Sequence, residues 1–546
     1  MEALDWLVIG VFFLALIGII VWVVRQKQND SADYFLGGRD ATWLAIGASI
    51  FASNIGSEHL IGLAGAGASS GMAMAHWEIQ GWMILILGWV FVPFYTRSMV
   101  YTMPEFLERR YNPQSRTILS VISLVSYVLT KVAVTVYAGG LVFQQVFGIK
   151  ELWGIDFFWI AAIGLVVLTA LYTIFGGMKS VLYTSVLQTP ILLLGSLIIL
   201  VLGFKELGGW DEMMRVCGAV TVNDYGDTMT NLIRSNDDAN FPWLGALIGS
   251  AIIGFWYWCT DQFIVQRVLS GKNEMEARRG TIFGAYLKLL PVFLFLIPGM
   301  IAFALHQKYI GAGGEGFLPM LANGTANADA AFPTLVAKLL PAGVKGLVVC
   351  GILAALMSSL ASLFNSSAML FTIDFYKRFR PETPEKKLVG IGQVATVVIV
   401  ILGILWIPIM RSVGDVLYTY LQDVQSVLAP GIAAAFLLGI CWKRTSAQGG
   451  MWGLVAGMVI GLTRLGAKVY YSNAGEVADS TFKYLFYDMN WLFFCGWMFL
   501  FCIIVVIVVS LATKAPTAEK IQGLVFGTAT KEQKAATRAS WNHWDI

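Results

Sequence analysis

Long runs of uncharged, apolar residues constrain this chain more than any other feature of its sequence. No charged residue interrupts the runs from Trp6 to Val24, from Leu388 to Met410 and from Trp491 to Thr513. Each run reaches the ~20 apolar residues that an α-helix needs to cross a hydrocarbon core about 30 Å thick. Charged residues make up 13% of the 546 residues, against about 25% in an average soluble domain. The sequence therefore predicts an all-α polytopic membrane protein.

Weakly charged stretches of similar length recur along the chain and predict about 13 transmembrane helices. They cover residues 4–24, 43–67, 75–96, 117–146, 153–175, 184–203, 243–268, 281–305, 342–372, 388–410, 415–440, 449–470 and 489–513. The expected parts are an extra N-terminal helix with its loop (1–42), a first five-helix repeat (43–203), an extracellular loop (204–242), a second repeat (243–443, with an outer loop at 306–341), C-terminal helices (444–513) and a cytoplasmic tail (514–546).

Basic residues gather in the connections after the first, third, seventh, ninth and eleventh spans, which all lie on one side. These residues are Arg25, Lys27, Arg39, Arg97, Arg109, Arg110, Arg116, Arg267, Lys272, Arg278, Arg279, Lys377, Arg378, Arg380, Lys443 and Arg444. Because lysine and arginine are retained on the cytoplasmic side of a membrane, the pattern predicts an outside N terminus and a cytoplasmic C terminus. The expected location is the plasma (inner) membrane, which the chain crosses many times.

Two of the predicted spans carry polar residues where the bilayer midplane should be. One runs from Trp43 to His59 and the other from Gly249 to Asp261. Each opens a run of five spans, and because five is odd, the second run starts from the opposite side of the membrane. Paired interrupted helices in two inverted halves are typical of the binding site of a secondary transporter. An unwound midplane is tolerated only where it lines protein or a water-filled cavity.

Charged residues inside the predicted spans indicate where that site lies, because a charge at a helix centre costs about 2.5–3.5 kcal/mol on insertion scales. Glu78 and Lys288 either neutralise each other or line a pocket for a neutral polyol. Sugar hydroxyls both donate and accept hydrogen bonds, so such a pocket needs partners of both kinds. Further groups of this type are Asn54, His59 and Gln422. Lys131, also inside a span, is assigned no functional role.

A serine cluster in the ninth span, Ser358, Ser359 and Ser362, is a candidate for Na⁺ coordination. Serine in a transmembrane helix is more often packing material or bonded to its own backbone. The free carbonyls expected at the unwound segment from Ala52 to Ile55 favour the ion site, because half-helix ends with unpaired carbonyls attract cations.

Aromatic and apolar residues flank the same points. Tyr257 and Trp258 are expected to stack on a pyranose and close its inner exit, and the outer shield is expected from Leu63, Trp77 and Tyr418. Core packing is the default interpretation of each residue taken alone. No nucleophile–base pair or cofactor loop favours an enzyme, and no basic stripe favours nucleic-acid binding. Na⁺ as the coupling ion is the only expected cofactor.

Three long motifs resemble the sodium/glucose cotransporter branch of the sodium:solute symporter family. They run from Trp43 to Ser57, from Trp256 to Arg267, and from Met357 to Tyr376. The resemblance extends over nearly all of residues 30–515 and implies a LeuT-type 5+5 inverted-repeat core with Na⁺ and sugar bound at the midplane.

By motif match, the resemblance implies which residues bind the two solutes. The Na⁺ site falls on the carbonyls of Ala52, Ile55 and Ala355 and on the hydroxyls of Ser358 and Ser359. The sugar site falls on Asn54, His59, Glu78, Tyr257, Trp258, Lys288 and Gln422, and Tyr257 matches the inner gate.

The chain departs from the family pattern at two informative positions. Family members that move two Na⁺ ions carry an aspartate where this chain has Ser185, so one Na⁺ per sugar is expected. Gly254 replaces a polar residue and removes one possible sugar contact. The expected function is Na⁺-coupled symport of a hexose, D-glucose or D-galactose. The alternatives are another organic solute such as myo-inositol or sialic acid, and a sugar-gated sodium channel or sensor.

Overall fold

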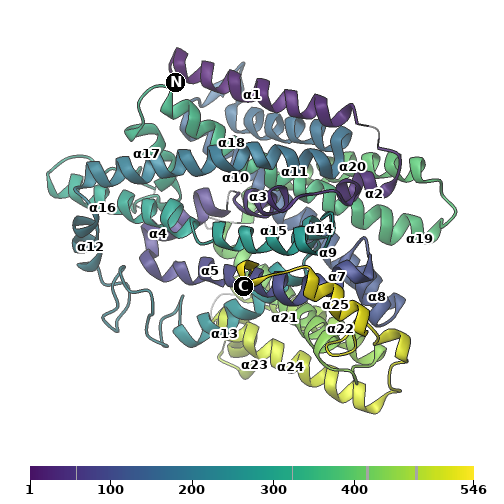
Figure 1. Cartoon of the computed structure of the whole chain (residues 1–546). Helices are drawn as coiled ribbons and strands as arrows, with labels where there is room; N and C mark the ends of the chain where they lie inside the picture. Colours follow the sequence, from purple (N-terminus) through teal and green to yellow (C-terminus); the bar gives the residue numbers. More distant parts are fainter. Residues whose placement is uncertain (27, 57, 322–323, 414–416, 474–477, 546) are drawn as a thin grey trace.

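The computed structural model of the chain is a single bundle of helices (Figure 1). It describes residues 1–546 except 27, 57, 322–323, 414–416, 474–477 and 546, and describes only the backbone of 129–130, 145, 409–413, 417–423, 473 and 544. One two-stranded hairpin, β1 (Glu151–Leu152) with β2 (Ile155–Asp156), is antiparallel. The remaining elements are α-helices joined or extended by short 3₁₀ and π turns, which are labelled η.

The first half of the chain contains the following helical elements: α1 (Ala3–Val24), α2 (Ser31–Leu36), η1 (Gly37–Arg39), α3 (Trp43–Asn54), η2 (Glu58–Leu63), α4 (Ala64–Ser70), η3 (Gly71–Met74), α5 (Ala75–Ile79), η4 (Gln80–Trp82), α6 (Met83–Ile86), η5 (Leu87–Phe91), α7 (Val92–Ser98), α8 (Met103–Arg110), α9 (Pro113–Ser126), η6 (Tyr127–Val132), α10 (Ala133–Phe147), α11 (Phe157–Leu207) and α12 (Trp210–Gly218).

The second half contains α13 (Trp243–Gly254), η7 (Phe255–Thr260), α14 (Gln262–Leu269), α15 (Glu274–Leu287), η8 (Val292–Leu296), α16 (Ile297–Gly311), η9 (Ala328–Ala330), α17 (Ala331–Leu339), α18 (Val344–Met369), η10 (Leu370–Tyr376), α19 (Lys377–Phe379), α20 (Glu385–Val413), α21 (Leu417–Cys441), α22 (Ala447–Asn473), α23 (Thr481–Lys483), η11 (Tyr484–Asp488), α24 (Trp491–Ala512), η12 (Ala518–Lys520), α25 (Lys531–Ala539) and η13 (His543–Asp545).

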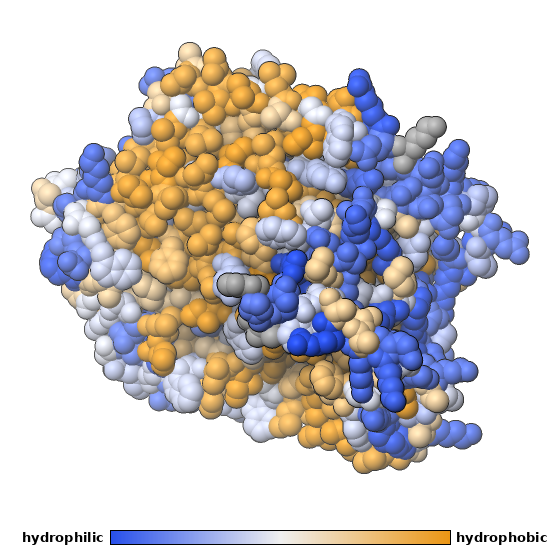
Figure 2. Space-filling model, in the orientation of Figure 1, coloured by the Kyte–Doolittle hydropathy of each residue, from blue (hydrophilic) through white to orange (hydrophobic). Residues whose placement is uncertain are grey.

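The surface of the bundle is that of a membrane protein. Figure 2 shows a broad hydrophobic belt, with hydrophilic side chains concentrated at one end, where Figure 1 places α8, α19 and α25. Among the described residues, ten helices are long and apolar enough to cross a membrane. The lipid-facing helices α1 and α24 are also the most apolar, with mean hydropathies of 3.1 and 3.0. The chain is therefore a multi-pass integral membrane protein.

The sequence predicts about 13 spans, whereas ten helices in the described residues are long enough to cross a membrane, because some spans are short or joined. Two further predicted spans contain shorter apolar helices, Trp43–Asn54 and Ala133–Gln144. Two others are joined in α11, which has 51 residues. A straight helix of that length would measure about 77 Å, more than twice the thickness of the hydrocarbon core. Gly177, with φ of 53° and ψ of −148°, divides α11 into two passes, and a side chain there would collide with the backbone of Tyr34.

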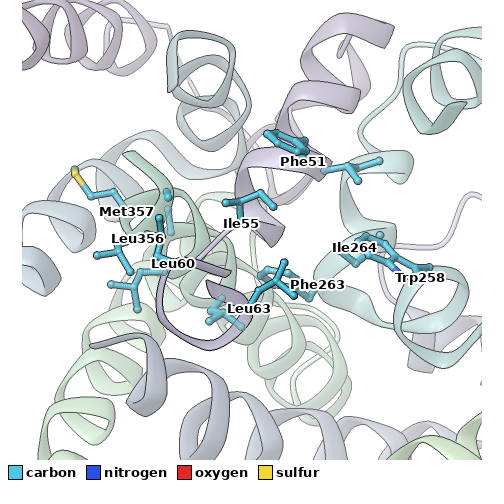
Figure 3. Packing of buried hydrophobic residues seen from close by; sticks show 14 of the residues in the cluster. Phe51, Ile55, Leu60, Leu63, Trp258, Phe263, Ile264, Leu356 and Met357 are labelled. Atoms are coloured by element: carbon cyan, nitrogen blue, oxygen red, sulfur yellow. The ribbon is translucent and has the colours of Figure 1, made fainter. Parts of the chain in front are cut away.

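Both spans that the sequence predicted to be interrupted are broken in the structure. Helix α3 ends at Asn54, and Ile55 is extended (φ −84°, ψ 96°) before the chain resumes as η2. Figure 3 shows Phe51, Ile55, Leu60 and Leu63 around this break, packed among other buried hydrophobic side chains. In the second span, α13 continues into the π-helical η7 and stops at the extended Asp261 (φ −74°, ψ 129°), after which α14 begins.

Close helix crossings hold the first broken span in place. A side-chain carbon at Gly47 of α3 would lie 2.8 Å from the carbonyl oxygen of Gly280 in α15, and one at Gly280 would lie 2.6 Å from Ile46. Small residues at such a crossing let two helix backbones approach closely, which is the usual device for packing helices within a membrane. On its other side α3 contacts α18, the helix with the largest buried share, 89%, among the spanning segments.

The C-terminal tail packs against the charged end of the bundle. The Arg279 guanidinium in α15 lies 2.7 Å from the Asp545 carboxylate, and Arg278 donates to the Ser540 hydroxyl at 2.7 Å. Nearer the last spanning helix, the backbone N–H of Phe526 donates to the carbonyl of Ile440 at the end of α21 (2.7 Å). The tail thus joins the ends of two helices that are far apart in the sequence.

Candidate functional site

The two broken spans meet around one small polar cavity. It is lined by Asn54, Glu58, His59, Trp77, Glu78, Gln80, Ile253, Tyr257, Trp258, Lys288 and Gln425. Its volume is about 30 Å³, and a water molecule needs roughly 10–15 Å³ by this measure. The cavity as it stands holds about two waters, so a larger solute requires the lining side chains to part.

Three buried side chains form a compact triad at the centre of this cavity. The Lys288 Nζ lies 2.6 Å from Oε2 of Glu78 and 2.7 Å from Nε2 of His59, and Oε1 of Glu78 lies 3.2 Å from the same imidazole nitrogen. An ammonium only donates hydrogen bonds, so Nε2 is the acceptor of the shorter contact and the His59 ring is neutral with its proton on Nδ1. The triad is therefore one cation, one anion and one neutral ring, and carries no net charge.

Several polar atoms around the triad have no protein partner. Oδ1 of Asn54, Nδ1 of His59 and Oε1 of Gln80 are buried and make no hydrogen bond, although all three residues line the cavity. A buried polar atom without a partner costs about 1–3 kcal/mol. The three atoms comprise two acceptors and one donor, which is the set that a solute with several hydroxyl groups can satisfy.

Tyr257 closes one side of the cavity. Its hydroxyl accepts a hydrogen bond from the Asn54 amide at 2.8 Å, which links the ends of the two broken spans directly. The Lys131 Nζ lies 4.5 Å from the centre of the Tyr257 ring and 2.8 Å from Oδ2 of Asp261. The sequence assigned no role to Lys131, but this buried pair supports the ring of the predicted gate from below, through a cation–π contact and a charge-assisted hydrogen bond.

Two of the predicted Na⁺ ligands, the hydroxyls of Ser358 and Ser359, lie where α18 contacts the end of α3. The Ser359 hydroxyl donates to the carbonyl of Ser53 at 2.8 Å, and the Ser358 hydroxyl lies 3.4 Å from that of Ser53. Ala52, Ile55 and Ala355 are each 1% exposed or less. Because α3 ends at Asn54, the carbonyls of its last turn lack the donors that a continuing helix would supply. The Ser53 carbonyl and the hydroxyls of Ser53, Ser358 and Ser359 are thus neighbours in buried surroundings, and oxygen ligands of this kind suit a hard cation.

A buried arginine lies beside this group of oxygens. Arg267 is 1% exposed and donates to the hydroxyls of Ser49 (3.1 Å) and Ser53 (2.8 Å). Among the described side chains no ion pair joins it to a carboxylate. Ser185, where the family pattern has an aspartate, donates instead to its own helix at Val181 and lies 3.2 Å from the Ser358 hydroxyl. The guanidinium therefore bonds serine hydroxyls directly rather than a carboxylate.

The remaining predicted residues are placed as follows. Trp258 is 2% exposed, lines the cavity and has the Lys288 Nζ 5.7 Å from its ring centre. Trp77 also lines the cavity, and its ring lies edge-on 5.6 Å from that of Trp491. Leu63 is fully buried in the hydrophobic cluster around the helix break and is not among the cavity residues. The side chains of Gln422 and Tyr418 lie outside the described residues.

Sequence reasoning missed four lining residues, Glu58, Gln80, Ile253 and Gln425. Gln425 follows the predicted Gln422 by three positions in the sequence, a spacing at which helical residues are neighbours, and that spacing was a usable signal. Gln80 lies two residues after Glu78, where a regular helix would turn it away from the cavity. In the structure α5 ends at Ile79, the short η4 turn begins at Gln80, and Gln80 lines the cavity.

Two broken helices that meet around a polar cavity are typical of secondary transporters, and this structure has the LeuT fold. The structure superposes on that of a Na⁺-coupled sialic acid symporter with a TM-score of 0.75 at 21% identity, covering 94% of this chain and 99% of the other. For Mhp1, a nucleobase-cation-symport-1 family transporter, the TM-score is 0.51 at 14% identity, with 94% and 99% covered.

The chain belongs to the sodium:solute symporter family, whose profile matches residues 34–457. It is 36% identical over 542 residues to the sodium/myo-inositol cotransporter 2 of Mus musculus, covering 97% of this chain and 80% of that protein. It is 35% identical over 560 residues to the sodium/glucose cotransporter 4 of Danio rerio, covering 99% and 84%. The protein is therefore a Na⁺-coupled solute symporter, and Na⁺ is its coupling ion.

Proposed function

We propose that the protein carries a hexose, D-glucose or D-galactose, together with one Na⁺ ion by alternating access. The observation that carries this proposal is the cavity between the broken spans. It presents a neutral triad, Glu78, His59 and Lys288, next to three polar atoms without partners. A hexose has hydroxyl groups that both donate and accept, so it satisfies these groups without adding charge.

Sugar binding is proposed to separate the triad. Hydroxyl groups entering between Lys288 and Glu78 replace the contact at 2.6 Å with charge-assisted hydrogen bonds to each partner. Trp258 offers an apolar ring face next to the ammonium. The resemblance to sodium/glucose cotransporters adds Gln422 to this set, and the cavity adds Gln425.

The Na⁺ ion is proposed to bind the carbonyls of Ala52, Ile55 and Ala355 and the hydroxyls of Ser358 and Ser359. Such an ion bridges the end of α3 to α18 and so fixes the broken span that also carries Asn54. Coupling requires that Na⁺ bind more tightly to the state open to the outside than to the state open to the inside. In the second state Tyr257 moves away from Asn54, and both solutes leave.

One Na⁺ per sugar is proposed because Ser185 stands where family members that move two Na⁺ ions carry an aspartate, so no carboxylate at this position offsets the charge of a second cation. One charge crossing 100 mV contributes about 2.3 kcal/mol, and a tenfold Na⁺ gradient adds about 1.4 kcal/mol. Together these support a sugar gradient of several hundredfold.

The charged end of the bundle, with α8, α19 and the tail, is proposed to face the cytoplasm. The basic residues gathered there follow the positive-inside rule. The N terminus of α1 then lies outside, and the plasma (inner) membrane is the proposed location.

A second candidate solute is myo-inositol, because several relatives that are 36% identical to this chain are named sodium/myo-inositol cotransporters. A six-membered ring carrying six hydroxyl groups presents the same donors and acceptors as a hexose and no charge. The neutral triad fits either compound better than a carboxylate-bearing solute such as sialic acid.

Uptake into proteoliposomes decides between these solutes. The purified full chain is reconstituted, a Na⁺ gradient is imposed, and accumulation of labelled D-glucose, D-galactose, myo-inositol and sialic acid is measured against a K⁺ control. Accumulation of a hexose above its outside concentration supports the proposal. Accumulation of myo-inositol but of no hexose would show that the second candidate is the transported solute. Sodium current without uphill movement of any solute contradicts symport.

A further inference from the structure

Gly254 is the last residue of α13 and lies directly before the π turn that carries Tyr257 and Trp258. A side-chain carbon built on Gly254 would lie 2.7 Å from Oε1 of Gln80 and 3.3 Å from Cγ of Met83. The space that a side chain at position 254 would occupy is therefore filled by the amide of Gln80, which comes from the neighbouring span.

The Gln80 amide has no protein partner for its oxygen. Gln80 is 6% exposed, lines the cavity and leaves Oε1 buried without a hydrogen bond. A buried amide oxygen is expensive to leave unpaired, and a position with this cost is retained most easily where a ligand supplies the partner. Because Oε1 only accepts hydrogen bonds, the matching ligand group is a hydroxyl that donates.

We infer that Gln80 is a substrate-binding residue of this chain, which accepts a hydrogen bond from one hydroxyl of the polyol and takes the place of the side chain missing at Gly254. The inference rests on the proposed polyol-binding function of the same cavity. The two positions depend on each other. A side chain at position 254 would collide with the amide of Gln80, and a small residue at position 80 would leave a gap beside Gly254.

Gln80 also belongs to the wall of a second hollow. A cavity of about 410 Å³ between α5, η4 and α13 is lined by Gln80 together with His76, Trp82, Trp243 and Ser250, among others. Replacing Gln80 by a small residue would join the two spaces. Leucine is therefore the appropriate replacement, because it removes the amide and keeps most of the bulk of the wall.

The experiment measures Na⁺-dependent binding of the transported polyol and of its set of single-deoxy analogues to the purified full chain. Gln80→Leu is expected to weaken binding of the parent compound roughly 3- to 10-fold, the effect of one lost hydrogen bond. It is expected to leave unchanged the binding of the one analogue that lacks the matching hydroxyl. If Gln80 had a purely structural role, Gln80→Leu would weaken the binding of all analogues alike. An effect that disappears for one analogue therefore distinguishes a substrate-binding role from a structural one.

Gly254→Ala tests whether the missing side chain at position 254 is needed for Gln80 to bind the polyol. It is expected to displace Gln80 and to give the same loss with the same analogue, and to add little in the Gln80→Leu background, because the two changes remove one interaction. Gly245→Ala is the matched control: it lies on the same helix, and its new carbon would lie 3.1 Å from Pro242 and 3.2 Å from Leu492, away from the cavity.

The outcomes are distinct. If the wild-type chain binds the parent compound and Gln80→Leu weakens all analogues equally or none, the inference is wrong and the proposed function stands. If the wild-type chain binds neither hexoses nor myo-inositol with Na⁺ present, the proposed function fails and the inference fails with it.

Discussion

The Lys131 ammonium lies 2.8 Å from the Asp261 carboxylate, at the point where the second broken span resumes as α14. Both side chains are buried, with exposed fractions of 5% and 2%. Asp261 also caps the new helix by accepting from the N–H of Phe263, and it receives the Tyr127 hydroxyl. The Asp261 carboxylate therefore caps the start of α14 after the break and is also the counter-ion of the Lys131 ammonium, which contacts the ring of Tyr257.

Removal of either member of this pair is expected to destabilise the protein strongly. Lys131→Met or Asp261→Asn leaves the other charge buried and unpaired, which costs about 3–5 kcal/mol. The double variant is expected to lose less than the sum of the single losses, because it leaves no isolated charge. Thermal unfolding in detergent measures the difference, and Lys377→Met, at a half-exposed pair with Glu385, is the control. Strictly additive losses would show that the pair is not coupled.

Glu78→Gln is expected to weaken sugar binding about 10- to 100-fold. The neutral amide cannot form the charge-assisted hydrogen bonds that a carboxylate makes with sugar hydroxyls, which are worth about 1.5–3 kcal/mol. It also leaves Lys288 without a counter-charge. Na⁺-dependent uptake over a range of sugar concentrations measures the change in KM. Glu385→Gln, on the charged surface, is the control and is expected to behave as wild type. Unchanged uptake by Glu78→Gln would remove the triad from the sugar site.

The number of Na⁺ ions per sugar is expected to change from one to two in Ser185→Asp. A carboxylate at this position would lie beside the Ser358 hydroxyl and supply the negative charge that a second buried cation needs. With one charge per sugar, a tenfold change in the sugar gradient shifts the reversal potential by about 59 mV, and with two charges by about 30 mV.

Ser185→Asn keeps the size of the aspartate without its charge and is expected to retain the single-ion slope. A wild-type slope of about 30 mV would refute the argument from Ser185.

Asp545→Asn is expected to loosen the tail. Burial acts to raise the pKa of Asp545, but the Arg279 guanidinium and backbone N–H donors outweigh it, so the pKa is lowered. A carboxylate whose pKa falls on folding stabilises the folded state at pH values above its unfolded pKa of about 3.9 and loses this effect as the pH falls through the lower, folded value. Tail docking is therefore expected to be constant from neutral pH down to mildly acidic pH.

Hydrogen exchange of the α25 amides tests this expectation. The substitution is expected to speed exchange roughly 2- to 5-fold, the effect of one partly exposed ion pair. Tail docking that weakens between pH 8 and pH 6 in the wild-type chain would contradict the assignment of the contact to Asp545.

The fold was predictable to the extent that it follows from hydropathy and from polar interruptions. Uncharged runs marked the spans, and polar residues at Asn54 and Asp261 marked both breaks, because neither residue is tolerated at the midplane of a continuous lipid-facing helix. The division of α11 at Gly177 was predicted only as a gap between two apolar runs.

The site residues that could be predicted from the sequence are those whose charge is rare within a membrane span. The residues that reach the cavity only because of how the helices pack could not be predicted. Glu78 and Lys288 stood out as charges, but the distance between them, and so the collapsed cavity, depends on how α5 and α15 pack. Gln80 and Gln425 are ordinary polar residues in the sequence, and only the η4 turn and the register of α21 bring them to the cavity. The role of Lys131 required its partner, 130 positions further along the chain.

The neutral triad has a consequence for the half of the cycle in which the protein returns without cargo. With Glu78 and Lys288 in contact, each charge of the proposed sugar site has its counter-ion within the protein when no solute is bound. A neutral solute that separates them leaves the sum of their charges unchanged. The electrical work of transport then comes only from the cation and the residues around it. Changing the solute from one polyol to another is therefore expected to alter the turnover rate but not the charge moved in each transport cycle.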